Sequence, residues 1–273
     1  MRTSRALFLI FVSTLVQASA AEEPPVEWIE PATGHKVVRL SREPGSASLY
    51  FHQNAYSADG KKLIITTPGG LSTINLQTRE IDQVVQGRVN VLVTGRKTGQ
   101  VYYIRDGTVC ATDLDTRATR EVAKVPAEMG RGGNIAVNAD ETLLVGIATD
   151  RDGQAEPRTR PPGGSGEGRL EPRWAAGTPM VLYTINVATG EVKKIYREHD
   201  WTNHLQCSPT DPNLIRFCHE GPWHYVDRVW TIRADGSGLR LMHKRTMDME
   251  ISGHEFFAAD GKVDPEFGNK LNT

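Results

Sequence analysis

The chain has 273 residues, with 32 Lys and Arg against 33 Asp and Glu, and a formal net charge of −1. This balance excludes a polybasic nucleic-acid-binding protein, because binding to a phosphate backbone needs an excess of clustered cations. We therefore expect no nucleic-acid partner. Apolar residues make up 38% of the chain, and 26 Gly with 15 Pro indicate many turns. The composition predicts a globular, all-β protein rather than a disordered or helical one.

The N-terminus has the features of a secretory signal peptide. Arg2 and Arg5 precede an apolar run at residues 6–16, and small residues at 18–20 supply a signal-peptidase site. An uncleaved anchor is the alternative, but an eleven-residue run is short against the roughly 20 residues that span a bilayer. We predict that residues 1–20 are removed, and that the product is exported to the periplasm or secreted without a stable membrane span.

Two local patterns recur along the rest of the chain. A tight-turn pattern precedes an apolar, alternating segment at residues 58–60, 97–99, 139–141, 210–212 and 259–261. A pattern of strand, turn and strand occurs at residues 74–84, 112–122, 185–195 and 231–242. Both patterns have the period-two alternation that antiparallel strands require.

The turn patterns are spaced by about 40 residues. The steps are 40 residues from Asp59 to Gly99 and 42 from Gly99 to Glu141. One longer step contains a segment at about residues 150–179 that is rich in Pro, Gly and Arg, which we interpret as a loop insertion without strand or helix. A period near 40 residues with about four short strands is typical of a β-propeller blade, and a flat antiparallel sandwich is the alternative.

The number of repeats predicts an incomplete propeller. Residues 21–273 are expected to form a partial β-propeller domain with about four complete blades and the start of a fifth, which begins at Ile251. The strand pattern at residues 36–41 is expected to close the ring by pairing with the last blade. Residues 263–273 carry no alternating strand pattern, so we expect the chain to be a C-terminally truncated part of a closed propeller.

Three histidines occupy equivalent places in the repeat. His52, His204 and His254 all precede a turn pattern, in the expected first strand of a blade. That strand lines the central channel of a propeller, where ligands bind, so these histidines are candidate binding residues. Three separate structural histidines are the alternative.

The densest group of polar residues is RFCHEGPWHYVDR at residues 216–228, expected in the loop after the second strand of blade four. Arg228 offers a permanently charged, planar fork that suits a carboxylate. A solvated edge formed by Asp227 and Arg228 is the alternative.

The cysteines do not predict a disulfide framework or a zinc site. Cys110, Cys207 and Cys218 cannot all pair with one another, and no CxxC or other close Cys and His spacing that would make a zinc site is present. Cys207 and Cys218 could meet on neighbouring strands, or both could be buried free thiols.

Four segments carry a resemblance to a known family. HQNAYSADGKKL, FCHEGP, DRVW and HEFF, in this order, resemble segments of the oligogalacturonide (oligogalacturonate) lyases, pectin-degrading polysaccharide lyases with a seven-bladed β-propeller. The resemblance extends over about residues 28–262. It implies β-elimination of short, usually unsaturated oligogalacturonates, with Mn²⁺ as cofactor.

The resemblance also implies roles for particular residues. It assigns His254 as the base and Arg228 to the uronate carboxylate. A histidine titrates near neutral pH and suits proton removal, and an arginine stabilises the negative charge that develops next to the carboxylate. His52, His204 and His219 are further candidates for substrate binding.

The resemblance places the metal ligands, three His and a Gln, beyond the end of this chain. No His follows His254 and no Gln follows Gln206, so we expect no metal ligands in this chain. The competing hypothesis is a non-catalytic exported propeller, either a binding module or a truncated remnant.

Overall fold

The computed structural model describes residues 26–130, 134–159, 170–222, 225–247, 250, 252–253 and 255–262. The predicted signal peptide, residues 1–20, and the predicted base His254 lie outside the described residues. The chain divides into two compact units, residues 1–40 and residues 41–273. In the described residues, no helix has the length and apolar character needed to cross a membrane.

The smaller unit contains one antiparallel hairpin. Strand β1 (Glu27–Ile29) pairs with β2 (Lys36–Val38), with Trp28 opposite Val37. In the described residues, β2 pairs with β1 and with no strand of the four blades, so the predicted pairing of residues 36–41 with the last blade is not seen there. β1 is the extended segment nearest to β2 in the sequence, and a short turn lets the two strands pair. The sequence pattern of a strand does not by itself identify its partner.

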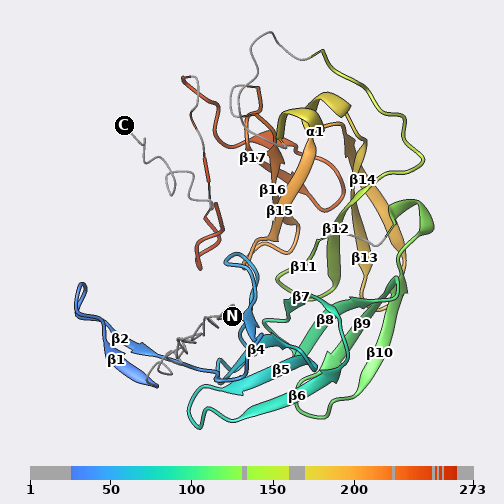
Figure 1. Cartoon of the computed structure of the whole chain (residues 1–273). Helices are drawn as coiled ribbons and strands as arrows, with labels where there is room; N and C mark the ends of the chain where they lie inside the picture. Colours follow the sequence, from blue (N-terminus) through green and yellow to red (C-terminus); the bar gives the residue numbers. More distant parts are fainter. Residues whose placement is uncertain are drawn as a thin grey trace, which may run out of the picture. The chain divides into compact units, whose positions relative to one another are not determined.

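The larger unit contains four four-stranded antiparallel sheets in its described part, each built from consecutive strands (Figure 1). Blade 1 has β3 (Ala47–Ser48), β4 (Lys62–Thr67), β5 (Gly70–Asn75) and β6 (Ile81–Gln86). Blade 2 has β7 (Asn90–Thr94), β8 (Gln100–Arg105), β9 (Thr108–Asp113) and β10 (Thr119–Lys124). Blade 3 has β11 (Ile135–Val137), β12 (Leu143–Thr149), β13 (Met180–Asn186) and β14 (Val192–Glu198). Blade 4 has β15 (Trp201–Cys207), β16 (Leu214–Glu220), β17 (Val229–Arg233) and β18 (Arg240–Leu241).

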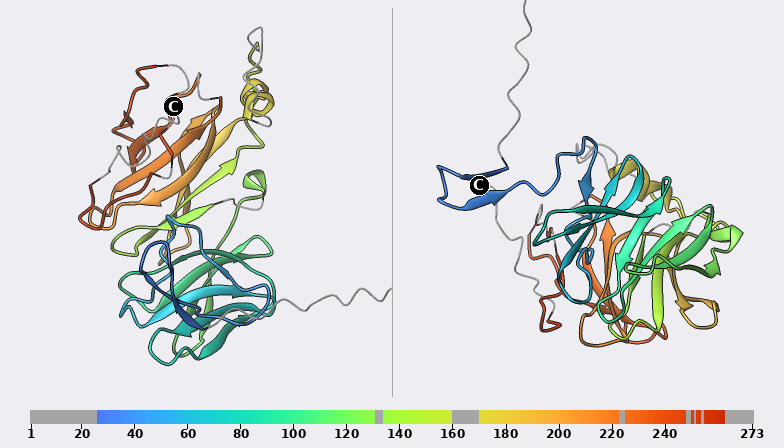
Figure 2. Two further views of the ribbon diagram at one scale, coloured as in Figure 1. Left: turned by 60° about the vertical axis from the view of Figure 1, so that its left-hand side comes forward. Right: turned by 90° about the horizontal axis from the view of Figure 1, so that it is seen from below.

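The predicted all-β propeller arrangement with four blades is confirmed. Figure 2 shows the same succession of sheets from two further directions. Neighbouring blades contact each other at or near their first strands. Thr94 at the end of β7 donates its N–H to the carbonyl of Asn54, between β3 and β4, at 3.1 Å. Asn134, just before β11, donates to Asn203 of β15 at 2.8 Å. The predicted strand, turn and strand patterns form the pairs β5–β6, β9–β10, β13–β14 and β17–β18.

Alternating side chains of one blade pack against both neighbouring blades. In β13, Val181 and Tyr183 belong to the hydrophobic core that blade 3 shares with blades 1 and 2. Met180 and Leu182, on the opposite face, belong to the core shared with blade 4. Successive side chains of a strand point to opposite faces, so a central strand between two blades is apolar at every position rather than at every second one.

The turns between first and second strands explain the repeat. At residues 57–62, Gly60 donates to the carbonyl of Ser57 at 2.9 Å, and Asp59 accepts from the Lys61 N–H at 3.1 Å. At the start of the fifth repeat, Gly261 donates in the same way to the carbonyl of Ala258 at 2.9 Å. Asp accepts the local N–H and Gly takes the positive φ of the turn, which is why both residue types recur.

The insertion at residues 150–179 contains helix α1 (Leu170–Ala176), so the expectation of an insertion without helix is wrong. Pro172 lies in its first turn, where a missing N–H costs nothing. Three backbone hydrogen bonds of 2.8–2.9 Å also join the two ends of the insertion. In each, an N–H of the first half donates to a carbonyl of the second half: Asp150 to Pro179, Glu156 to Gly177, and Arg158 to Ala175. A short 3-10 helix, η1 (Ala127–Met129), precedes blade 3.

We expect Leu182→Ala to lower the free energy of unfolding by about 2–5 kcal/mol, because it removes a fully buried side chain from the core between blades 3 and 4. Leu239→Ala is the matched control, since Leu239 is 41% exposed and its loss should change stability by less than about 0.5 kcal/mol. Urea unfolding of the three proteins measures the difference. Equal midpoints for the two variants would contradict the core described above.

Candidate active site

The insertion and the β16–β17 loop lie at one end of the blades. In an antiparallel blade, the connections from second to third strand and from fourth strand to the next blade emerge at the same end. The insertion, the β16–β17 loop at residues 221–228 and the β14–β15 connection therefore share one end, which we call the insertion end. The turn patterns lie at the other end. Polar side chains that contact one another gather toward the insertion end of blade 4.

The centre of this group is Arg228, at the end of the β16–β17 loop. Its Nη1 donates to Glu220 Oε2 at 2.7 Å, and its Nε donates to Glu255 Oε1 at 3.2 Å. Its Nη2 lies 3.3 Å from Nδ1 of His204. The fully buried Arg216 lies 3.6 Å from Glu255 Oε1. We call His204, Arg216, Glu220, Arg228 and Glu255 the Arg228 cluster.

Strand alternation brings three members of this group to one face of β16. Arg216, Cys218 and Glu220 are two residues apart, so all three point to the same side of the strand. Cys218 donates its S–H to Glu255 Oε1, and Arg216 Nη1 donates to Cys218 Sγ at 3.4 Å. Sequence reasoning missed Arg216, Glu220 and Glu255, although the alternation in RFCHE was a visible signal.

Charge pairing holds these groups ionised. Burial favours the neutral form of Glu255, but hydrogen bonding to His204 and the charge of Arg228 outweigh it and hold the pKa of Glu255 well below its usual range. Burial likewise disfavours the charge of Arg228, but the neighbouring Cys218, Glu255 and Glu220 raise its pKa further above its usual value. Two buried cations and two carboxylates therefore neutralise one another, as buried charges must.

His204 has a strained backbone that turns its side chain toward Arg228. Its φ is +48°, a value that is rare for residues other than Gly, and it lies in a bulge of β15 between Asn203 and Gln206. Bulges redirect a side chain out of the normal alternation and are frequent next to active sites. The ring of His204 lies 5.5 Å from the ring of His52, between centroids.

His52 is a neutral imidazole next to the Arg228 cluster. Burial, together with the charges of His204 and Arg216, lowers the pKa of His52 to about 4. Its Nδ1 is buried and has no hydrogen-bond partner in the described part of the chain. Gln206 Nε2 donates to the His52 carbonyl at 3.1 Å and thereby links blade 4 to blade 1. The structure thus brings together three predicted residues, His52, His204 and Arg228.

His219 does not join them. It points to the opposite face of β16, where its Nε2 lies 2.5 Å from Glu198 and its Nδ1 3.3 Å from Asp200. Its ring stacks on Trp230 with centroids 5.1 Å apart. Burial alone would lower the pKa of His219, but hydrogen bonds to Asp200 and Glu198 raise it to about 9. His219 is therefore a buried imidazolium between two carboxylates.

The cysteines are free thiols, and all three are buried. Cys207 and Cys218 lie on neighbouring strands, but Cys207 is opposite Ile215 and Cys218 is opposite Asn203. The two sulfur atoms therefore have no common register position at which a disulfide would form.

Two groups of side chains in the described residues have donor atoms close enough to hold a metal ion. His204, Cys218 and Glu255 form the first, and burial raises the pKa of the Cys218 thiol well above its usual value. Arg216 and Arg228 both contact this group, and their charges oppose a further cation. A protonated thiol is also a poor ligand for Mn²⁺, which prefers oxygen and nitrogen.

Glu198, Asp200 and His219 form the second group. Their donor types suit Mn²⁺, but the protonated His219 would have to lose its proton first. Arg158 and Thr202 already donate to Asp200 and Glu198, respectively. Neither described group therefore fits Mn²⁺ as it stands.

Comparisons with known proteins identify the family. A family model described as oligogalacturonate lyase matches residues 27–264. The chain belongs to the oligogalacturonate lyase family. An oligogalacturonide lyase of Pectobacterium atrosepticum and an oligogalacturonate lyase of Dickeya dadantii are each 28% identical to it over 244 residues. The alignments cover 86% of this chain and 61% of each relative, so the chain spans about three fifths of the length of these family members.

Solved structures of the family agree with this assignment. An oligogalacturonate lyase in complex with manganese matches with a TM-score of 0.69 at 28% identity, covering 86% of this chain and 63% of the other. The oligogalacturonate lyase of Vibrio parahaemolyticus matches with the same TM-score at 27% identity and the same coverage. TolB from Acinetobacter baumannii, at 13% identity and a TM-score of 0.51, shows the fold alone.

Glu255→Ala is expected to lower the free energy of unfolding by about 3–5 kcal/mol, because it leaves the buried Arg216 and Arg228 without a carboxylate that both contact. Glu191→Ala, which removes an exposed carboxylate, is the control and should be close to the unchanged protein. Urea unfolding compares them. A Glu255→Ala protein as stable as the control would contradict the charge pairing described here.

The pKa of His219 predicts a pH dependence of stability. Its folded value of about 9 lies above the unfolded value of about 6.5, so the folded state binds the proton more tightly. The stabilisation is fully present below pH 6.5, declines as pH rises and is lost above about pH 9. Unfolding free energies measured from pH 6 to 10 should fall more steeply for the unchanged protein than for His219→Gln. Parallel curves would show that His219 is not protonated in the fold.

Proposed function

We propose that the protein catalyses β-elimination of short, unsaturated oligogalacturonates, a reaction of pectin breakdown. The observation that supports this proposal most is the Arg228 cluster at the insertion end, in a chain that belongs to the oligogalacturonate lyase family. In the reaction, a base removes the proton on C5 of a galacturonate residue. The electron pair of the C5–H bond forms the C4–C5 double bond, the C4–O4 bond breaks, and O4 leaves with a proton.

Arg228 is proposed to bind the carboxylate next to C5. A guanidinium has five N–H donors, and the contacts to Glu220, Glu255 and His204 use one on each nitrogen atom. Two donors remain for a uronate carboxylate. Because the two glutamates hold the guanidinium in place, its charge is preorganised and needs no rearrangement when negative charge develops at the carboxylate.

His254 is proposed as the base that removes the C5 proton. Glu255, which follows His254 in the sequence, is held in the Arg228 cluster by Arg228 and Arg216. His52 and His204 are proposed to contact the substrate beside Arg228. His52 supports this role because it is neutral above about pH 4 and its free Nδ1 accepts a hydrogen bond.

The cofactor and the location of the protein are also proposals. We propose that Mn²⁺ participates, as the solved manganese complex of a family member suggests, and that ligands other than the two described groups hold it. We further propose export after removal of residues 1–20, which N-terminal sequencing of the secreted product tests directly.

A non-catalytic oligogalacturonate-binding propeller is the second candidate function. It is favoured by the pairing of Arg228 with two carboxylates and by the poor fit of both described donor groups to Mn²⁺. This candidate predicts binding of oligogalacturonate without product formation.

The activity test follows the ultraviolet absorbance of the conjugated double bond formed from unsaturated digalacturonate, with Mn²⁺ added and with chelator. His254→Ala should lower turnover by about two to four decades, because general base catalysis contributes about that much. His35→Ala, which removes an exposed histidine of the smaller unit, is the matched control and should keep full activity. Equal rates for the two variants would remove His254 from the mechanism.

Arg228→Lys should not restore the activity lost in Arg228→Ala, because an ammonium group lacks the planar fork that Glu220, Glu255 and a carboxylate share. If the unchanged protein forms no product with Mn²⁺ yet binds oligogalacturonate, the lyase proposal is wrong and the binding module is supported.

A further inference from the structure

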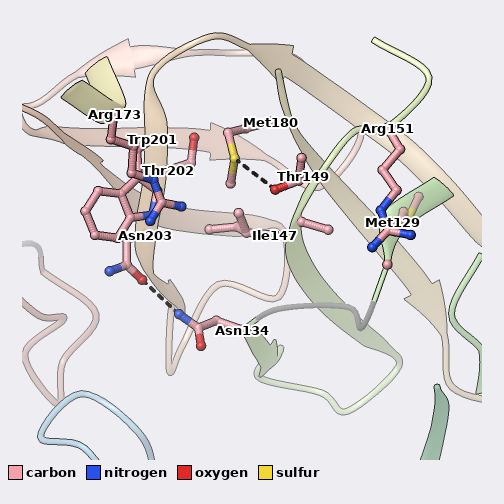
Figure 3. Close-up of a pocket in the computed structure, with 12 residues that line it drawn as sticks. Met129, Asn134, Ile147, Thr149, Arg151, Arg173, Met180, Trp201, Thr202 and Asn203 are labelled. Carbon is pink, nitrogen blue, oxygen red and sulfur yellow. Dashed lines mark hydrogen bonds between the residues drawn. The ribbon is translucent and has the colours of Figure 1, made fainter. Parts of the chain in front are cut away.

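A pocket of about 550 Å³ lies between blades 3 and 4. Figure 3 shows Arg173 from helix α1 on one side of it and Arg151 from the start of the insertion on the other. Between them lie the apolar side chains of Ile147 and Met180. The insertion thus supplies two cations to a pocket whose floor comes from the propeller itself.

The pocket is positively charged. Two guanidinium groups line it, and no carboxylate is among its lining residues. In the described residues, neither Arg151 nor Arg173 has a carboxylate within 4 Å of its guanidinium nitrogens. By contrast, Arg158 of the same insertion binds Asp200. The charge of Glu220 acts on Arg173 and favours its charged form, but Glu220 does not line the pocket. A pocket lined by two guanidinium groups favours a negatively charged ligand.

Stacking holds Arg173 in place, and Arg151 lies close to the backbone of Gly130. The Arg173 guanidinium stacks on the Trp201 ring with Cζ 3.6 Å from the ring centroid. Such stacking leaves the N–H groups at the edge of the guanidinium free to donate. On the other side, a Cβ atom at Gly130 would lie 3.0 Å from Arg151 Nη2. The glycine, with φ of +60°, therefore gives the Arg151 side chain its space.

The remaining lining fits a sugar ring. Asn134 and Asn203 lie together below Trp201, joined by a hydrogen bond of 2.8 Å, and their remaining amide donors and acceptors suit ring hydroxyls (Figure 3). Ile147 and Met180 are buried and apolar, as the C–H face of a sugar requires. Carboxylate, hydroxyls and an apolar face occur together in a hexuronate residue.

Strand β15 connects this pocket to the Arg228 cluster. Trp201 and Asn203 line the pocket, and the next residue, His204, belongs to the cluster. In the pairing of β15 with β16, Trp201 is also opposite Glu220, and Glu220 binds Arg228. An oligogalacturonate carries a carboxylate on every residue, which matches the two groups of cations that β15 connects.

We propose that this pocket binds the galacturonate residue next to the one that loses its C5 proton, through Arg173 and Arg151. The proposal rests on the proposed function for the identity of the sugar. It assigns Arg173 to the carboxylate of that residue and Arg151 to the opposite wall. Neither arginine takes part in proton removal.

The test measures binding rather than turnover. Titration calorimetry compares galacturonate, trigalacturonate, an uncharged galactose trisaccharide and inorganic phosphate, with chelator present and in a His254→Ala background that prevents cleavage. Trigalacturonate should bind at least 10-fold more tightly than galacturonate and than the uncharged trisaccharide. The double variant Arg151→Gln, Arg173→Gln should lose at least 10-fold in trigalacturonate affinity and keep its affinity for galacturonate.

The matched control is Arg117→Gln, which removes a half-exposed arginine of blade 2 that pairs with Asp82. It should bind trigalacturonate like the unchanged protein, and thermal unfolding checks that all variants are folded. The proposal is overturned if the double variant binds trigalacturonate as tightly as the protein without these two substitutions. It is also overturned if phosphate at equal concentration displaces trigalacturonate, or if the protein without these substitutions binds no trigalacturonate. Binding with the expected pattern, together with no ultraviolet-detected product from the protein that keeps His254, would contradict the lyase activity and leave the pocket assignment standing.

Discussion

The contact between Arg228 and Glu255 connects the loop of blade 4 to the segment that begins the fifth repeat. Glu255 is almost completely buried, with 2% of its side chain exposed, and a buried carboxylate is stable only with cations and donors around it. Arg216, Arg228 and Cys218 supply them. This pairing holds the Arg228 cluster together at the insertion end of blade 4.

The propeller scaffold explains why these groups meet. Arg216, Cys218 and Glu220 alternate on one face of β16, and the bulge of β15 turns His204 to the same side. The insertion is attached to blade 4 through aromatic and charged contacts. Trp174 stacks on Tyr225 with centroids 5.0 Å apart, and Arg158 binds Asp200. These contacts hold α1, and with it Arg173, beside the strand that carries His204.

Features with a regular period were predictable from the sequence. The 40-residue spacing of Asp and Gly turns, with apolar alternation between them, was sufficient to predict four blades and their hairpins, because turn chemistry and strand alternation are local properties. Helix α1 was missed because its seven residues lie in a segment dominated by Pro and Gly. The pairing of β2 with β1 was missed because the choice of a strand partner depends on long-range geometry.

The site was predictable only in part. His52, His204 and Arg228 were found, since their positions in the repeat or motif indicate the channel. His219 was grouped with them, but it is one residue out of phase with Arg216, Cys218 and Glu220, so the strand points it to the opposite face. Glu255 and Gln206 were missed because their partners are distant in sequence: Gln206 Oε1 accepts from the N–H of Phe257 at 2.9 Å.

A crystal structure of the His254→Ala protein with bound trigalacturonate tests the central claim most directly. The account predicts that the sugar lies at the insertion end, with one carboxylate on Arg228 and another within hydrogen-bond distance of Arg173. A sugar bound at the end with the turns, or one bound without contact to either arginine, would contradict it.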